Sequence, residues 1–185
     1  MIEKEHVLEV LQQAEKAIEK EDILKLKDLS NQTIHSASIY EDTDSILVAV
    51  IIYSLSKILE RANYREYPSW NYFYKNSTMH LNRSIHALKE NDENNFIKEL
   101  QKVRKDISKL TGNFKQHVQD VFQKASINKA SRIYEHGISM SQTANLLGVS
   151  IWDLAEYAGR TGIADINLAI TLDVKNHTLK GMACN

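Results

Sequence analysis

Proline and glycine are scarce in this chain of 185 residues, which contains one proline and six glycines. Both residues punctuate the turns between strands, so their scarcity argues against a β-sandwich or barrel and indicates long helices. Hydrophobic residues make up 43% of the chain, which is enough to bury a core. The composition therefore predicts an all-α protein.

Cysteine is almost absent as well, since Cys184 is the single one. One cysteine forms neither an internal disulfide nor a cysteine-based zinc site, which favours a reducing compartment. The opening MIEKEHVLEV lacks the basic and apolar regions of a signal peptide. The most apolar run, ILVAVIIYSL at 46–55, has about half of the roughly 20 residues that a bilayer span requires. We expect a soluble, cytoplasmic protein with no membrane contact.

An excess of positive charge is also lacking, because the formal net charge is -1 and the pI is about 6.7. The chain as a whole therefore offers no positive field to a phosphate backbone. Any nucleic-acid contact needs a local basic patch.

Helical periodicity runs through the first 125 residues. Val7, Leu11, Ala14 and Ile18 follow the spacing of one helix face, and Asp22 is placed to cap a second helix. The cluster EDTD at 41–44 predicts a turn and caps before a third helix at about 44–62. That helix is apolar on nearly all sides, so we place it at the centre of a bundle.

The periodicity continues beyond Pro68, which suits the first turn of a fourth helix. Phe96, Leu100, Val103, Ile107 and Leu110 mark the next, and Gly112 stands where a C-terminal glycine cap would. A further helix begins near residue 113 and either runs on to about Gly137 or breaks near Asn128.

We predict two units, a helical bundle over 1–125 and a helix-turn-helix unit with a short C-terminal extension over 126–185, with a border that one long helix could cross. Residues 166–180 fit either a helix or an alternating strand in a hairpin, and we favour the helix because everything before them is helical.

The second unit contains the stretch ISMSQTANLLGVSIWDLAEYAGRTG at 138–162, laid out as helix, turn and helix. Ala144 is a small residue where two helices would cross closely, and Gly148, four positions later, tolerates the positive φ of a tight turn. Ser150 is placed to cap the second helix. The expected buried positions are apolar: Leu147, Val149, Leu154 and Tyr157.

These residues resemble the helix-turn-helix of transcription regulators. The order of residues is similar to that of small antitoxin-like regulatory proteins. It runs LLG, an aliphatic residue and Ser, then a helix with aromatic and acidic residues, then Arg and Gly-Ile. The resemblance covers about 35 of the 185 residues and implies that the second helix enters the major groove of DNA. Base edges would then face the residues Ser150, Trp152, Asp153 and Glu156, and the DNA backbone would face Gln142 and Arg160.

The charged residues of this unit leave two interpretations of its function. Its positive residues over 126–165 are Lys129, Arg132 and Arg160, against Glu135, Asp153, Glu156 and Asp165. So few cations predict selective but weak DNA binding. A homodimer would double the contacts and could add Lys102, Arg104, Lys105 and Lys109 if they lie near the same face. The alternative is that Asp153 and Glu156 form a solvated face or contact a protein partner, with no nucleic acid involved.

No constellation of residues points to an enzyme, a cofactor or a metal. His80 and His86 are six residues apart, which puts them on different faces of a helix, and we expect surface or boundary histidines. The Arg-to-His spacings 83–86 and 132–136 depart from those of helical ribonucleases of prokaryotic defence systems. We expect the aromatic stretch YREYPSWNYFY at 64–74 to pack against the bundle rather than to stack bases.

Overall fold

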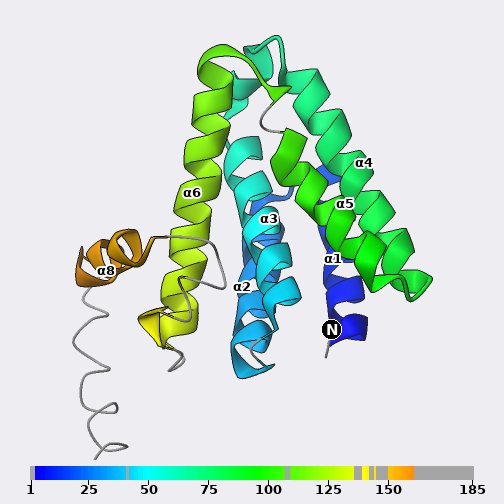
Figure 1. Cartoon of the computed structure of the whole chain (residues 1–185). Helices are drawn as coiled ribbons and strands as arrows, with labels where there is room; N and C mark the ends of the chain where they lie inside the picture. Colours follow the sequence, from blue (N-terminus) through cyan, green and yellow to red (C-terminus); the bar gives the residue numbers. More distant parts are fainter. Residues whose placement is uncertain are drawn as a thin grey trace, which may run out of the picture.

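The computed structural model describes residues 3–40, 42–106, 109–135, 139–141, 144 and 150–160 (Figure 1), and every regular element in them is helical. This confirms the all-α prediction. The elements are α1 (Lys4–Glu19), α2 (Ile23–Tyr40), α3 (Thr43–Leu59), the 3-10 helix η1 (Ala62–Glu66), α4 (Trp70–Lys89), α5 (Glu93–Asp106), α6 (Gly112–Glu135) and α8 (Ile151–Arg160). None of these helices is long and apolar enough to cross a membrane.

Short polar side chains start several of the helices. The Asp22 carboxylate accepts a hydrogen bond from the Lys25 amide at 2.9 Å, as its predicted role as a cap requires. Asp42 does the same for the Asp44 amide at 3.1 Å and opens α3, which confirms the predicted cap in EDTD. Each bond satisfies an amide that has no partner within its own helix.

The central helix of the bundle is α3, as the sequence predicts. It packs against α1, α2, α5 and α6, and Figure 1 shows it within the group of long helices. Ile46, Val48, Ala49, Ile51 and Ile52 are completely buried. A helix that meets neighbours on several sides cannot keep a wet face, which explains its nearly uniform apolar sequence.

The fifth predicted helix differs from the structure at its end. The helix α5 ends at Asp106, and Gly112, with φ of 58°, opens α6 instead of capping α5. Leu110 is buried although it lies in the connection between the two helices. Leu110 fits the spacing of an apolar helix face, so the sequence pattern predicted a helix that is too long. After this connection α6 runs through Asn128 without a break.

Two apolar clusters hold the helices together. The larger one fills the bundle between α1 and α6. The smaller one joins α2, α3 and the second half of α6 to α8, and its buried members are Ile34, Ala37, Ile46, Ala49, Val50, Ala125, Ala130, Ile133, Ala144 and Leu154. Since α6 contributes to both clusters, it crosses the predicted border at residue 125, and the division into two units stays a prediction.

The aromatic stretch at 64–74 packs against the start of α6. The Tyr64 and Tyr67 rings lie 5.6 Å and 5.1 Å from the ring of Phe114. Phe73 meets the same ring edge-on at 5.9 Å. Such offset and edge-on contacts between rings are typical of packed aromatic groups, so the packing role predicted for this stretch is confirmed.

Candidate functional site

The helix α8 is attached to the bundle through one face. Leu154 is completely buried in the smaller apolar cluster, which also contains Ala130 and Ile133 of α6. Figure 1 shows α8 lying crosswise beside α6. The Trp152 amide donates to Ser150 Oγ at 3.2 Å, so Ser150 caps this helix as predicted. Among the described residues of α8, Leu154 packs this ten-residue helix against the bundle and Ser150 caps its start.

The opposite face of α8 is open to solvent. Trp152 is 80% exposed, Ile151 is 41% exposed, and Glu156 is exposed as well. A tryptophan with most of its surface in water is unusual, because burying its large apolar surface normally contributes to stability. The prediction that Trp152 stands outside the packed face is confirmed.

The remaining helix-turn-helix residues are described in part. Ala144 is helical and 4% exposed, and it belongs to the same apolar cluster as Leu154. Small size and burial together fit a position where a second helix passes closely. The predictions for Gln142, Leu147, Gly148 and Val149, and for the side chains of Asp153, Tyr157 and Arg160, lie outside the described residues.

The described residues of α8 and of the second half of α6 offer little exposed positive charge. Among the α8 side chains that the structure describes, the charged one is the acidic Glu156. Lys129, which the sequence offers as a cation of this unit, is completely buried, with Nζ donating to Asn31 Oδ1 at 2.9 Å and lying 4.2 Å from the centre of the Tyr53 ring. Lys129 therefore holds α6 against α2 and α3 and offers nothing to an external phosphate.

The basic residues of α5 do not add to the α8 face within one chain. Lys102, Arg104 and Lys105 are on α5, and Lys109 follows it. Figure 1 shows α5 and α8 on opposite sides of the bundle, with α6 and α3 between them. The condition that these cations lie near the face of α8 is not met inside a single chain.

The structure also contains a buried ionic cluster that the sequence did not predict. His80 of α4 lies between two carboxylates of α5, with Nδ1 2.7 Å from Glu99 Oε2 and Nε2 3.1 Å from Asp106 Oδ2. The three residues are between 4% and 6% exposed. The expectation that His80 is a surface or boundary residue is therefore wrong, whereas His86 is exposed, on a different face of α4.

Each carboxylate of this cluster also binds a lysine. Lys102 Nζ contacts Glu99 Oε1, and Lys109 Nζ lies 2.7 Å from Asp106 Oδ1. Burial raises the pKa of Glu99, but hydrogen bonds from Lys102 and His80 outweigh it, so the net effect is a lowered pKa. The hydrogen bond to Asp106, with a second one involving Tyr72, raises the pKa of Lys109.

This cluster is closed to chemistry from outside. All four carboxylate oxygens are engaged, and both ring nitrogens of His80 face carboxylates. Within the described residues no group of His, Cys, Asp and Glu is arranged to hold a metal ion. The cluster therefore adds ionic contacts to the apolar packing of α4 against α5.

A signal for this cluster exists in the sequence. Glu99 and Asp106 are seven residues apart and so share one side of α5, beside the apolar stripe that contains Phe96 and Val103. His80 lies between Ser77 and Leu81 on the buried side of α4. Three polar residues on the buried sides of two helices predict hydrogen bonds between them. The prediction can be made only when the two helices are known to pack together.

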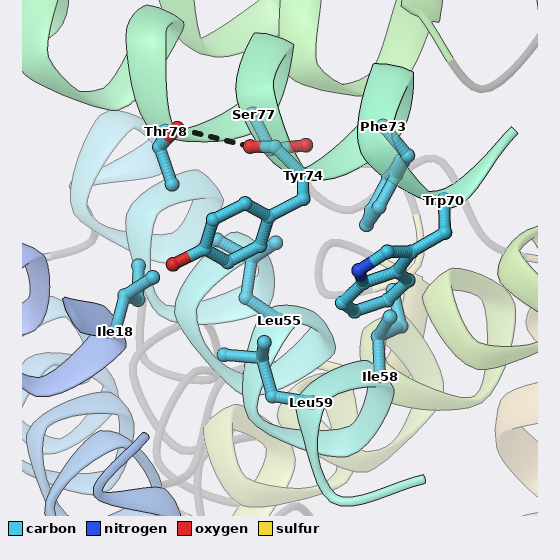
Figure 2. A pocket seen from close by; sticks show the side chains of 9 residues that line it. All are labelled: Ile18, Leu55, Ile58, Leu59, Trp70, Phe73, Tyr74, Ser77 and Thr78. Carbon is cyan, nitrogen blue, oxygen red and sulfur yellow. Dashed lines mark hydrogen bonds between the residues drawn. The ribbon is translucent and has the colours of Figure 1, made fainter. Parts of the chain in front are cut away.

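Two hollows among the described residues differ in size and in lining. Figure 2 shows one of about 10 Å³, lined by Ile18, Leu55, Ile58, Leu59, Trp70, Phe73, Tyr74, Ser77 and Thr78. That volume holds about one water molecule. A wider open hollow of about 790 Å³ lies between the start of α1 and the end of α4, and its lining mixes Glu3 and Glu5 with Lys4 and Lys89. Neither arrangement converges polar groups on a reacting atom.

Comparison with known proteins identifies no relative: no protein-family model, no curated protein and no solved structure matches this chain. The resemblance to helix-turn-helix regulators therefore depends on residues 138–162 alone and stays a prediction.

Proposed function

We propose that this protein is a DNA-associated regulatory factor, antitoxin-like or transcription-factor-like, and that α8 is its recognition helix. The observation that carries the proposal is the contrast within α8: Leu154 is completely buried, while Trp152, two residues earlier, is 80% exposed. A helix that enters a DNA groove needs one face packed against the protein and another face exposed to the DNA. The burial of Leu154 and the exposure of Trp152 supply these two faces.

The size of α8 fits this role. Ten residues make a helix about 15 Å long, and the major groove is about 12 Å wide and admits an α-helix. Recognition helices contact bases mainly through their N-terminal residues, where Ser150 and Trp152 stand here. In this proposal Trp152, with Asp153 and Glu156, faces base edges, and Gln142 and Arg160 contact the backbone. Carboxylates accept hydrogen bonds from cytosine N4 but repel phosphates, so affinity per chain is low.

Low affinity per chain favours a homodimer. Two copies related by a twofold axis place two recognition helices about one turn of DNA apart, about 34 Å. The two half-sites then contribute together to affinity, although each one alone binds weakly. We propose that the protein binds DNA as such a pair.

The test selects a bound duplex from a random-sequence pool and titrates that duplex by fluorescence anisotropy at about 50 mM and about 200 mM salt. We expect wild-type binding that weakens as salt rises, and a Trp152→Ala variant that binds about ten-fold more weakly, the effect of losing one good base contact. The matched control is Leu24→Ala, which removes an equally exposed apolar side chain, 79% against 80%, from α2. Equal binding by the Trp152→Ala variant and the wild type contradicts the proposal.

The second candidate is a protein-binding module without nucleic acid. The exposed pair Ile151 and Trp152 favours it, because tryptophan is enriched where interfaces gain most of their energy, and Glu156 suits a basic partner. Absence of duplex binding at low salt would select this candidate. If the partner is a second copy of the chain, the Trp152→Ala variant should then sediment as a smaller species than the wild type.

A further inference from the structure

The hairpin of α4 and α5 carries a row of lysines with no exposed acid between them. Lys98, Lys102 and Lys105 are exposed on one side of α5 at spacings of four and three, and Lys109 follows four residues later. The twenty residues of α4 contain neither Asp nor Glu. We call the four lysines the α5 basic face. It is locally cationic although the net charge of the chain is -1.

The carboxylates of this segment are turned away from solvent. Between residues 94 and 111 the acids are Glu99 and Asp106, and each is 4% exposed. Both face His80, and their second oxygens hold Lys102 and Lys109 in place. Two lysines of the row are therefore anchored at their ammonium groups by acids beneath them. The outer layer that a large anion meets is positive.

We propose that the α5 basic face binds the sugar-phosphate backbone of duplex DNA, without regard to base sequence and independently of α8. The part of the row on α5, from Lys98 to Lys105, spans about 10 Å at 1.5 Å per residue, and Lys109 follows beyond the end of the helix. Each strand of duplex DNA carries a phosphate about every 3.4 Å along the axis, so the row faces several phosphates in succession. Lysines act as point charges on mobile stems and contact phosphates with no preference for bases.

The shape of this surface favours DNA over other anions. A helix that lies in a lipid surface needs large apolar side chains beside its cations. Among the described residues near this row, the large apolar one that is exposed is Tyr72, at 39%, and it hydrogen-bonds with Lys109. Arg83, exposed on α4, adds another cation to the same hairpin. Because α5 and α8 lie on opposite sides of the bundle (Figure 1), a straight duplex on α5 does not reach α8 of the same chain.

The test compares two double variants of the full chain. Lys98→Gln with Lys105→Gln removes two charges from the α5 basic face and leaves the anchored Lys102 and Lys109 intact. Lys16→Gln with Lys20→Gln, both exposed at the end of α1, removes the same charge elsewhere. Affinity for a short mixed-sequence duplex is measured by anisotropy at about 50 mM and about 200 mM salt.

We expect the wild type and the α1 variant to lose affinity with salt equally. The α5 variant should lose about twelve-fold less across the same range, because two fewer phosphate contacts lower the salt slope by about 1.8. The Lys98→Gln variant alone should show about half of this change in slope. A salt dependence of the α5 variant equal to that of the wild type would overturn the proposal.

Two further arms distinguish this proposal from the others. Repeating the pair of substitutions in a Trp152→Ala background separates the two surfaces: if α8 does not bind DNA, the difference in slope caused by α5 persists.

Polyglutamate and vesicles of anionic lipid serve as competing anions at matched charge concentration. Displacement of the duplex by either one at equal concentration contradicts a surface made for DNA, and a failure of both to displace it supports one.

Discussion

The helices α5 and α8 lie on opposite sides of the bundle (Figure 1), and their packing differs: the larger apolar cluster and a buried ionic cluster hold α5, whereas α8 contributes to the smaller apolar cluster. One buried leucine, Leu154, attaches α8 and leaves an apolar and acidic outer face. A buried ionic cluster around His80 fastens α5 to α4 and leaves a basic outer face. In many DNA-binding proteins one surface supplies both the projecting helix and the cations. In this protein the projecting helix α8 and the cations of α5 lie on different sides of the bundle.

Under the proposed function, the charge of α8 is a poor guide to its partner. Charge attracts DNA over a distance and gives most of the non-specific affinity, whereas a projecting helix selects the sequence. A protein that divides these tasks can keep acids in its recognition helix and still carry a phosphate-binding surface elsewhere. The variants below disturb one side of the molecule and leave the other unchanged.

The largest effect is expected on the α4–α5 side, from His80→Gln. The variant leaves Glu99 and Asp106 buried without the imidazole ring between them, and removing one partner of a buried ionic contact in this way costs about 4 kcal/mol. The control is His86→Gln, which changes an exposed histidine of the same helix. Urea denaturation measures both. A free energy of unfolding that is equal in the two variants would mean that the cluster does not stabilise the hairpin.

On the α8 side we expect a smaller and local effect from Leu154→Ala. Truncation of a fully buried leucine costs about 3 kcal/mol, and here it should loosen α8 while the bundle stays folded. Hydrogen exchange at the α8 amides should become faster by about two orders of magnitude, with exchange in α4 and α5 unchanged. Unaltered exchange in α8 would show that Leu154 is not its anchor.

The pH dependence should also differ between the two sides. The pKa of Glu99 is lowered in the folded protein, since the hydrogen bonds from Lys102 and His80 outweigh the opposing effect of burial. Its contribution to stability is therefore present above the pKa of about 4.3 of an unfolded glutamate and is lost as the pH falls through the lower folded value. Glu99→Gln should be less stable at neutral pH and lose less on acidification, unlike Glu90→Gln, an exposed control. Parallel acid profiles for Glu99→Gln and the wild type would count against this account.

Local features of the fold were predictable from the sequence. Helix periodicity identified the central position of α3, and short acidic side chains identified the starts of α2 and α3, because both signals act within a few residues. The end of α5 was not predictable in this way. Leu110 is buried from a connection, and a buried residue has the same sequence signal in a turn and in a helix.

The candidate sites were predictable only where they depend on one helix. The buried Leu154 and the exposed Trp152 follow from the pattern of α8 itself. The partners of His80 come from another helix, 19 and 26 residues further along the chain, and depend on how α4 and α5 align. Lys129 shows the same limit, since its burial against Tyr53 depends on how three helices pack.

The most direct measurement follows the indole of Trp152 by iodide quenching in a Trp70→Phe variant, where Trp152 is the single tryptophan because the chain has two. A ring held outside the bundle by a buried neighbour should be strongly quenched in the free protein, and saturating duplex DNA should shield it. Emission that iodide does not quench in the free protein, or quenching that saturating DNA leaves unchanged, would contradict the placement of α8 as the recognition helix.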